Sequence, residues 1–462
     1  MNKRIAIFGG SFNPAGRHHR AVAEALGAHF DEIIVVPCGP RPDKPTVADT
    51  EPVHRAVMAD LNFHGLPKVR VELFDLEHET YTRTYDLDEM FRPQGEVWHV
   101  VGTDLIKGGH SGESQIQQGW YRGAELWQNA NFAVIERAGD DIIPADLPPH
   151  HELFRPDRSG SSSEIREKAF KRQSIADLVT PEVESYIARY NLYRGTPPQR
   201  SVSLKLDPRA LIIADERNPA AVELAASLRP FQNADNPNCI IVIGGDGTMI
   251  RAIRKHWRLR LPFIGLNAGH RGHLLNDLDH NGVPDVLESE KRVHQLPLLY
   301  SEVFGPDGSL VDACHAVNDT WVERASGQAA WIRVKVDGEI KLPKLVADGA
   351  LVATAAGSTA YAKAMGAKPL LVGAQEITLV GSNVTEPAGW KSASLPLDAE
   401  IEFESLNPRK RPIRAYIDGA EKGLVSRVRT RVSRVAAVEV AFSPKRDMAA
   451  KLADYFFSSA SS

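Results

Sequence analysis

The sequence predicts an α/β protein of at least two domains: a doubly wound N-terminal domain, then a second α/β domain with a β-rich C-terminal subdomain. Three observations predict this fold class. The 462 residues are too many for a single hydrophobic core. In two separate parts of the chain, short apolar runs alternate with helical segments, as they do in parallel sheets. Beyond about residue 299, short β-branched runs are separated by Asp-Gly and Asn-containing turns, which favours a β-rich subdomain.

The N-terminal half alternates between strand and helix. Strands are expected at residues 5–8, 33–37 and 97–101, and helices at 20–27 and 182–190. The following segment, 194–200, is polar and rich in turn residues, so it is unsuited to regular structure. We therefore place a first domain at residues 1–193 and a linker at 194–203.

A second alternation of strand and helix follows the linker. The expected elements are strands at 210–214, 239–243 and 332–336 and helices at 220–228 and from about 249. The turn Asp337-Gly338 comes directly after the last of these strands and is typical of a hairpin. We place an α/β subdomain at residues 204–298 and a β-rich subdomain with a C-terminal tail at 299–462.

Composition limits the partners that this protein can have. A formal net charge of -4 gives no basic field, which argues against nucleic acid and anionic membrane. Cys38, Cys239 and Cys314 lie far apart, so neither a disulfide framework nor a zinc cluster is expected, and no metal ligands are assigned. Because no apolar stretch has the length of a signal-peptide core or a membrane helix, we expect a cytoplasmic protein.

Each half contains a strand that runs directly into two glycines. The first turn is Gly9-Gly10-Ser11 and the second is Gly244-Gly245-Asp246. Glycines at the end of a strand let bare N–H groups approach a phosphate, so the two turns indicate two nucleotide sites. A tight turn without a ligand explains either pattern equally well. Neither turn is a P-loop or a complete dinucleotide fingerprint.

Asp246 is unusual because it places a carboxylate inside an amide-rich turn, where it would repel phosphate. One reason for an acid there is to accept a proton from an attacking hydroxyl, which typically contributes about 10²–10⁴-fold in rate. The alternative is that Asp246 only caps the helix that follows. The residue alone leaves both interpretations open.

Four further motifs accompany this turn. They are the glycine-rich segment 265–274, the pair Asn318-Asp319, the pair Asp348-Gly349 and the run Gly357-Ser358-Thr359-Ala360-Tyr361. Taken together, these motifs resemble the NAD kinase family over residues 208–445. Diacylglycerol and sphingosine kinases share a similar first turn but lack the last run, which argues against a lipid substrate. His273, where the family usually has Phe, and Ala355-Ala356, in place of Pro-Thr, are departures that affect substrate affinity more than chemistry.

The resemblance implies that Asp246 activates the adenosine-ribose 2'-hydroxyl of NAD for phosphorylation. It also implies an NAD-binding set that comprises Gly247, Asn318, Asp319, Asp348, Thr359, Ala360 and Tyr361. A divalent cation, Mg²⁺ in the first place, would neutralise the donor phosphates, and the donor is ATP or polyphosphate. Taken singly, Asn318-Asp319 fits a β-turn and Tyr361 fits core packing equally well.

Motifs in the first 192 residues resemble the nicotinamide or nicotinate mononucleotide adenylyltransferases. The motifs are the turn 9–14, His19 and the segment 161–166. Adenylyl transfer needs no general base, because the attacking phosphate is already an anion. By the resemblance, His19 and Arg166 are catalytic, and ATP and the mononucleotide are held by Gly9, Gly10, Ser11, Phe12, Gly102, Asp104, Trp120 and Ser162. Taken singly, His19 and Arg166 fit helix residues without a catalytic role, and Trp120 fits core packing.

The first of these motifs is altered. The family has His or Thr, any residue, Gly and His, whereas this chain has Gly16-Arg17-His18-His19. One lost charge-assisted hydrogen bond costs about 10- to 150-fold in rate. His18 either blocks the approach of ATP or, like Arg17, replaces the missing phosphate donor.

The leading hypothesis is a bifunctional enzyme that makes the dinucleotide from a mononucleotide and ATP and then phosphorylates it. The alternatives are an NAD kinase with an inactive, nucleotide-binding N-terminal domain, and a nucleotide-binding regulator without activity. The expected partners are small-molecule substrates, and the resemblance to these families implies a homo-oligomer. The sequence leaves open whether the mononucleotide carries nicotinamide or nicotinate.

Overall fold

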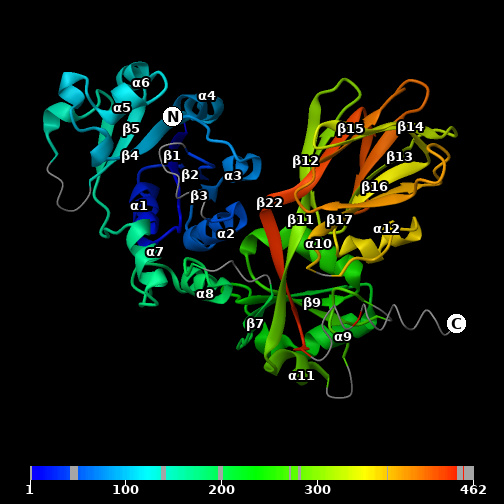
Figure 1. Ribbon diagram of the computed structural model, residues 1–462. Coiled ribbons are helices and arrows are strands. Elements are labelled where there is room, and N and C mark those ends of the chain that lie inside the picture. The colour runs from blue at the N-terminus through cyan, green and yellow to red at the C-terminus, as the bar shows by residue number, and fades with distance from the viewer. Residues whose placement is uncertain are drawn as a thin grey trace. The chain divides into compact units, whose positions relative to one another are not determined.

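The computed structural model describes residues 3–41, 50–136, 142–195, 201–269, 272–278, 282–371, 373–444 and 451. Residues 196–200 of the expected linker, and the Ser-rich tail, lie outside the described residues. The chain divides into two compact units, Met1–Gln199 and Arg200–Ser462. Each unit has its own sheets (Figure 1) and is described by itself.

The first unit is built on one parallel sheet with the strand order β3-β2-β1-β4-β5-β6. Its strands are β1 (Arg4–Gly10), β2 (Glu32–Pro37), β3 (Val69–Val71), β4 (Glu96–Gly102), β5 (Asn131–Ile135) and β6 (His151–Phe154). The order runs outward in both directions from β1 and β4, as in doubly wound folds, so the predicted fold class is confirmed. Ligands of such sheets bind in the crevice beyond the carboxyl ends of the two strands where the order reverses. Those ends are Gly10 and Gly102.

Eight α-helices are described in the first unit. They are α1 (Arg17–Gly27), α2 (Pro52–Phe63), α3 (Phe74–His78), α4 (Thr84–Phe91), α5 (Gln115–Gly119), α6 (Gly123–Asn129), α7 (Ser162–Phe170) and α8 (Pro181–Tyr190). Helix α1 begins three residues earlier than expected from sequence. Its start at Arg17 is stabilised by the His19 side chain, which accepts the N–H of Gly16. Across the described residues, no helix is both long and apolar enough to cross a membrane.

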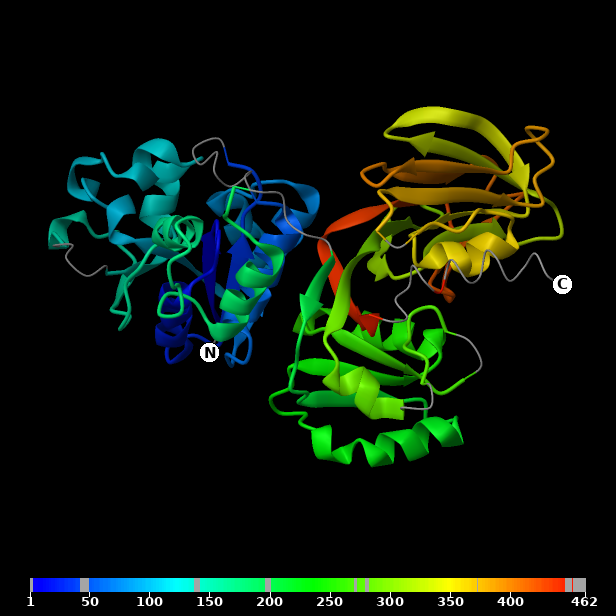
Figure 2. The same cartoon turned by 60° about the horizontal axis from the view of Figure 1, so that its bottom comes forward.

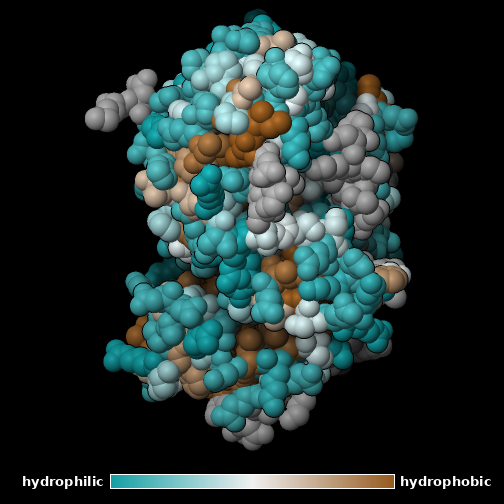
Figure 3. All heavy atoms as spheres, turned by 90° about the vertical axis from the view of Figure 1, so that its left-hand side faces the viewer, coloured by the Kyte–Doolittle hydropathy of each residue, from teal (hydrophilic) through white to brown (hydrophobic). Residues whose placement is uncertain are grey.

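The surface of the molecule in Figure 3 is mostly hydrophilic, and hydrophobic residues reach it in separate patches. In the first unit the large hydrophobic side chains that are exposed lie far apart in sequence: Tyr81, Met90, Tyr121, Ile143, Leu153 and Phe170. Hydrophobic residues scattered over a surface are ordinary and need no partner to explain them.

The second unit begins with an α/β lobe. Its parallel strands are β8 (Ala210–Ala214), β9 (Cys239–Gly244) and β10 (Phe263–Asn267), and its helices are α9 (Pro219–Ser227), α10 (Asp246–His256) and α11 (Gly282–Glu288). Strand β9 is buried along its whole length, as its apolar sequence predicts. Helix α10 begins at Asp246 rather than near residue 249, so Asp246 is the first residue of the helix.

The rest of the second unit is a β-rich lobe of two sheets, seen face to face in Figure 2. Its strands are β7 (Ser201–Leu204), β11 (Lys291–Phe304), β12 (Leu310–Ala316), β13 (Asp319–Arg324), β14 (Ala330–Val336), β15 (Glu339–Ala347), β16 (Gly349–Ala353), β17 (Glu376–Ser382), β18 (Ser392–Pro396), β19 (Ile401–Ser405), β20 (Ile413–Ile417), β21 (Ala420–Val425) and β22 (Arg427–Phe442). One sheet is antiparallel, with the order β18-β17-β16-β13-β20-β21. Ile332, Phe403 and Ile417 are among the core residues shared by the two sheets. Helix α12 (Tyr361–Ala364) packs on β16 and β17 through Ala362.

Two boundaries differ from those expected from sequence. The expected division at 298/299 cuts through β11, and β11 pairs with β22 along most of its length. Strand β22 also pairs with β19 and with β10, so it runs through both lobes (Figure 1). Residues 201–203, assigned to the linker, lie in β7, which pairs with β11. Local sequence patterns do not show these pairings, because the partner strands are far apart in the chain.

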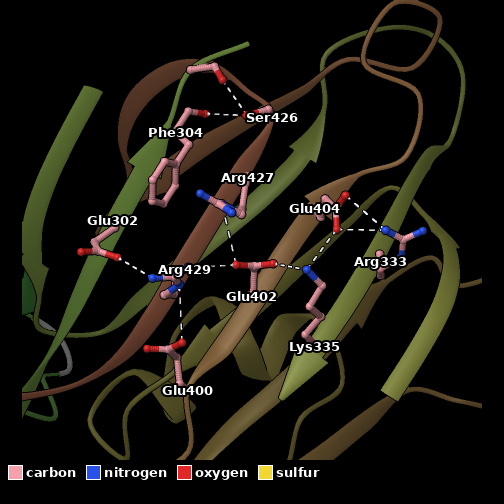
Figure 4. Close-up of polar contacts among 11 residues, drawn as sticks. Glu302, Phe304, Arg333, Lys335, Glu400, Glu402, Glu404, Ser426, Arg427 and Arg429 are labelled. Carbon is pink, nitrogen blue, oxygen red and sulfur yellow. Dashed lines mark hydrogen bonds and ion pairs between the residues drawn. The ribbon is translucent and has the colours of Figure 1, made fainter. Parts of the chain in front are cut away.

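A ladder of alternating charges covers the outer face of β14, β19 and β22 (Figure 4). Glu402 lies at its centre, 2.6 Å from Lys335 and 3.5 Å from Arg429. The hydrogen bond to Glu402 raises the pKa of Lys335. Arg333 pairs with Glu404 at the next position along the strands. Because opposite charges face each other across the strands, the pairs stabilise the register of the sheet.

The three cysteines are free thiols, as expected. Cys38 and Cys239 are buried and Cys314 is half-buried. Burial raises the pKa of each thiol, that of Cys239 to about 12. The thiols are therefore poor nucleophiles.

Candidate functional site

A cavity of about 910 Å³ lies in the first unit, and the carboxyl ends of β1 and β4 line it. Its lining includes every residue that the sequence assigned to this unit's site: Gly9, Gly10, Ser11, Phe12, His19, Gly102, Asp104, Trp120, Ser162 and Arg166. These residues come from segments spread over more than 150 positions of sequence. The fold therefore brings them together at the crevice where doubly wound sheets bind their ligands.

His19 lies in the first turn of α1 and its ring packs against Phe12, with ring centroids 4.9 Å apart. The N–H of Gly16 donates to His19 Nδ1 over 3.1 Å. This bond favours the neutral tautomer that carries its proton on Nε2. Nε2–H is then the polar group that His19 can offer to a ligand.

The start of α7 holds the glycine turn in place. The Ser162 hydroxyl donates to the carbonyl of Pro14 over 2.8 Å, and the Arg166 guanidinium donates to the carbonyl of Asn13 over 2.6 Å. Arg166 is therefore more than a solvated helix residue, although its role at a ligand remains a prediction. Since α1 and α7 both begin at residues around this cavity, their N-terminal N–H groups favour an anion there.

Trp120 lies where core packing and contact with a ligand are both possible. The side chain is half-buried and packs against the core cluster that contains Val101, Ile116 and Trp127. It also lines the cavity. An indole in this position offers an apolar face on which an aromatic ring can stack.

Sequence reasoning missed Asp75, which also lines the cavity. It is 1% exposed and accepts hydrogen bonds from the backbone N–H and the hydroxyl of Thr82. Burial raises the pKa of this carboxyl group. Asp75 lies in the short helix α3 without a motif around it, so no signal in the sequence pointed to it.

In the second unit, Asp246 comes shortly after β9, and its side chain extends from the first turn of α10. Its two carboxylate oxygens accept the N–H groups of His273 and Leu274, each over 2.9 Å. These donors belong to another segment, so the carboxylate is not occupied by capping its own helix. Gly247, the next residue, is exposed.

The pair Asn318-Asp319 leads into β13 instead of forming a β-turn. The N–H groups of both residues donate to the carboxylate of Asp418, over 2.8 Å and 3.2 Å. Asp319 is 3% exposed, and burial together with the nearby charge of Asp418 raises its pKa to about 7. Among the contacts within the described residues, the Oδ1 atom of Asn318 is buried and has no hydrogen-bond donor.

Gly357 lets the run at residues 357–361 pack closely against the Asn318-Asp319 pair. A Cβ atom at position 357 would lie 2.1 Å from the carbonyl oxygen of Asn318, so only glycine fits there. The Thr354 hydroxyl donates to the carbonyl of Val317 over 2.7 Å and strengthens the same contact. Thr359 ends the short 3-10 helix η8 (Gly357–Thr359), and the exposed Ala360 separates η8 from α12.

Asp348 and Tyr361 line a cavity of about 560 Å³ in the β-rich lobe. Asp348 pairs with Arg324 over 2.7 Å and accepts a hydrogen bond from Asn383 over 2.7 Å. Tyr361 is 40% exposed and its ring lies 4.8 Å from that of Trp321, so plain core packing does not describe it. Asp246 and Asn318 are not among the residues that line this cavity.

A shared hydrophobic cluster connects the separate motifs of the second unit. It contains Met249 of α10, Leu274 beside the N–H donors to Asp246, Val317 beside the Asn-Asp pair, and Ala356 beside Gly357. The α/β lobe and the β-rich lobe therefore present four of the five motifs around one core, and the Asp348-Gly349 pair is the one outside this cluster. The structure thus joins residues that are more than 100 positions apart in sequence.

The fold and these sites define the class of protein: a doubly wound nucleotidyltransferase-like domain, followed by an α/β domain with a β-rich lobe. Comparisons with known proteins agree with this class. Residues 7–168 match the model of the cytidylyltransferase-like family, and residues 205–288 match that of the ATP-NAD kinase N-terminal domain.

The C-terminal half is similar to NAD kinases over most of their length. It is 31% identical to the NAD kinase of Rickettsia bellii over 229 residues, which are 50% of this chain and 89% of that protein. It is 33% identical to the NAD kinase of Rickettsia typhi, again over 50% of this chain and 89% of that protein. The chain therefore belongs to the NAD kinase family, and it carries a cytidylyltransferase-like domain before the kinase region.

Two solved structures are also similar. Yeast NADH kinase complexed with NADH has a TM-score of 0.41 at 14% identity, and the match covers 76% of this chain and 84% of that one. An NAD kinase from Archaeoglobus fulgidus in complex with ATP has a TM-score of 0.41 at 19% identity, with 53% of this chain and 96% of that one covered.

Proposed function

We propose that the second unit phosphorylates NAD at the adenosine-ribose 2'-hydroxyl and that the first unit makes the dinucleotide from ATP and a pyridine mononucleotide. The observation that carries the kinase proposal is the placement of Asp246. The N–H groups of His273 and Leu274 fix its carboxylate at the end of β9. A carboxylate has about four acceptor positions, so a substrate hydroxyl can still donate to it.

In the kinase step, the 2'-oxygen of NAD attacks the γ-phosphorus of ATP. A new P–O bond forms, the bond from the γ-phosphorus to the bridging oxygen breaks, and ADP leaves with the electron pair. The carboxylate of Asp246 takes the hydroxyl proton. Mg²⁺ is commonly held by substrate phosphates and one or two carboxylates, so we expect the cation to arrive on ATP.

The NAD site is supported by the buried Oδ1 atom of Asn318. An acceptor left buried without a donor costs about 1–3 kcal/mol. A hydroxyl or amide group of bound NAD would remove this cost. Tyr361 and Asp348, at the neighbouring cavity, supply an aromatic face and an acceptor for the rest of the dinucleotide.

The kinase proposal is tested by replacing Asp246. The variant Asp246→Asn keeps the shape of the side chain but removes the base, so NADP formation is expected to fall by about 10²–10⁴-fold. Asp235→Asn is the matched control, because Asp235 is an exposed residue of the same lobe. If Asp246→Asn forms NADP at the rate of the control, Asp246 is not the base. Assays with ATP and with polyphosphate identify the donor.

In the first unit, an oxygen of the mononucleotide phosphate attacks the α-phosphorus of ATP. A P–O–P bond forms, the bond between the α-phosphorus and the bridging oxygen to the β-phosphorus breaks, and pyrophosphate leaves with the electron pair. No proton needs to be removed, because the attacking phosphate is an anion. The chain contributes Nε2–H of His19, the N-terminus of α7 and the backbone N–H groups of the glycine turn, which neutralise phosphate charge.

This second activity is tested by incubating the full chain with Mg²⁺, ATP and each mononucleotide in turn. The expected products are pyrophosphate and the dinucleotide, and comparison of the two mononucleotides gives the ring preference. His19→Ala is expected to reduce both products. If the unaltered chain releases no pyrophosphate with either mononucleotide, the first unit is a nucleotide-binding domain without this activity.

A further inference from the structure

The altered motif at residues 16–19 has a structural explanation. A Cβ atom at Gly16 would lie 2.9 Å from both Cε1 and Nδ1 of His18. The same Cβ would lie 2.8 Å from Cδ1 of Ile165. The space beside residue 16, where a side chain would begin, is therefore filled by the imidazole of His18 and by the Ile165 side chain. A side chain at position 16 therefore requires the His18 ring to move from the position it has in this structure.

The His18 ring lies among the groups of the proposed phosphate site. Both His18 and His19 line the large cavity of the first unit, and their ring centroids are 3.9 Å apart. A Cβ atom at Gly160 would lie 3.2 Å from His18 Nδ1, which places His18 beside the loop that leads into α7. His18 therefore lies between the beginnings of two helices, where an anion is favoured.

Arg17, the other candidate substitute in this motif, is directed elsewhere. Its Nε atom donates to the carbonyl of Val179 over 2.7 Å, and its backbone N–H donates to the carbonyl of Leu178 over 2.8 Å. Arg17 does not line the large cavity, whereas His18 does. The geometry favours the imidazole over the guanidinium as the second phosphate donor.

We propose that His18 supplies the imidazole that the chain lacks at position 16, so that the adjacent rings of His18 and His19 both contact the phosphates of ATP. The inference rests on the proposed adenylyl transfer, and it identifies His18 as the residue that lets the altered motif bind phosphate. His18 would donate a hydrogen bond to a phosphate oxygen while the bond to pyrophosphate breaks. The glycine at position 16 then leaves room for the His18 ring in this position.

Exchange of the two residues tests the proposal. His18→Ala is expected to lower the rate of mononucleotide-dependent pyrophosphate release by about 10- to 150-fold. Gly16→His alone is also expected to lower it, because the new side chain meets the His18 ring. The double variant Gly16→His with His18→Gly restores the usual order of the motif and is expected to recover most of the rate. His150→Ala, an exposed histidine of the same unit, is the control.

A second measurement does not depend on turnover. NMR of the full chain with isotope-labelled histidine identifies the His18 signal as the one absent from His18→Ala. Addition of pyrophosphate with Mg²⁺ is expected to shift the signals of His18 and His19 but not that of His150. Shifts at His19 without a shift at His18 would overturn the inference. So would an active His18→Ala variant.

The two measurements separate this inference from the proposed function. A chain that releases no pyrophosphate but shows the His18 shift supports phosphate contact and rejects adenylyl transfer. An active chain whose double variant stays as slow as Gly16→His alone retains adenylyl transfer and rejects the exchange of the two positions.

Discussion

The contact between Gly357 and the carbonyl of Asn318 allows a quantitative prediction. In Gly357→Ala the new methyl group would lie 2.1 Å from that oxygen. Ordinary contacts begin near 3.4 Å, so the two segments must separate by roughly 1 Å. Thr354 donates to the carbonyl of Val317 and accepts the N–H of residue 357, and both bonds would be strained.

The cost follows from these contacts. Overpacking of this kind costs about 1–3 kcal/mol, and each weakened hydrogen bond adds about 1 kcal/mol. We expect a loss of about 3 kcal/mol in the free energy of unfolding of the second unit. For a unit of this size, that loss lowers its Tm by about 6–12 °C. The KM for NAD is expected to rise, because Asn318 moves.

The assay is thermal unfolding of the full chain followed by NAD kinase kinetics. Gly327→Ala is the matched control, because a Cβ atom there meets nothing within 4 Å. Equal Tm and KM values for the two variants would refute the reasoning. A lower Tm with an unchanged KM would refute only the link between Gly357 and NAD.

Two further predictions concern buried charge. Because the pKa of Asp319 is raised to about 7, the folded state keeps a proton on this group at a pH where the unfolded chain has released it, so the free energy of unfolding falls between about pH 4 and 7. In urea unfolding at pH 5 and pH 8, the stability of Asp319→Asn relative to the unaltered chain is expected to be greater at pH 8. The same relative stability at both pH values would contradict this prediction. The Glu402 side chain is only 9% exposed and lies among three basic groups, so Glu402→Ala is expected to lower the free energy of unfolding by about 3 kcal/mol. Glu339→Ala removes an exposed ion pair with Lys341 and is expected to lower it by less than about 1 kcal/mol. Equal urea midpoints for these two variants would contradict the second prediction.

Local elements were predictable because their signals are local. The runs at residues 5–8 and 239–243 are apolar and end in glycines, and both form buried strands that end in turns. The hairpin at Asp337-Gly338 is confirmed, with both residues in the left-handed region. Helix starts were less accurate: α10 begins at Asp246 because the backbone of Gly245 serves as its N-cap, and no side chain marks that position in the sequence.

The sequence by itself determined the α/β class, the two glycine turns and the resemblance to the NAD kinase family, since motif order and residue type are properties of the chain. Only the tertiary structure decided which groups meet. It placed the N–H donors of Asp246 at residues 273 and 274, and it set the carboxylate of Asp418 against the backbone of the Asn318-Asp319 pair. These contacts join segments by packing and long-range pairing, whose energies depend on distance in space and leave no trace in neighbouring residues.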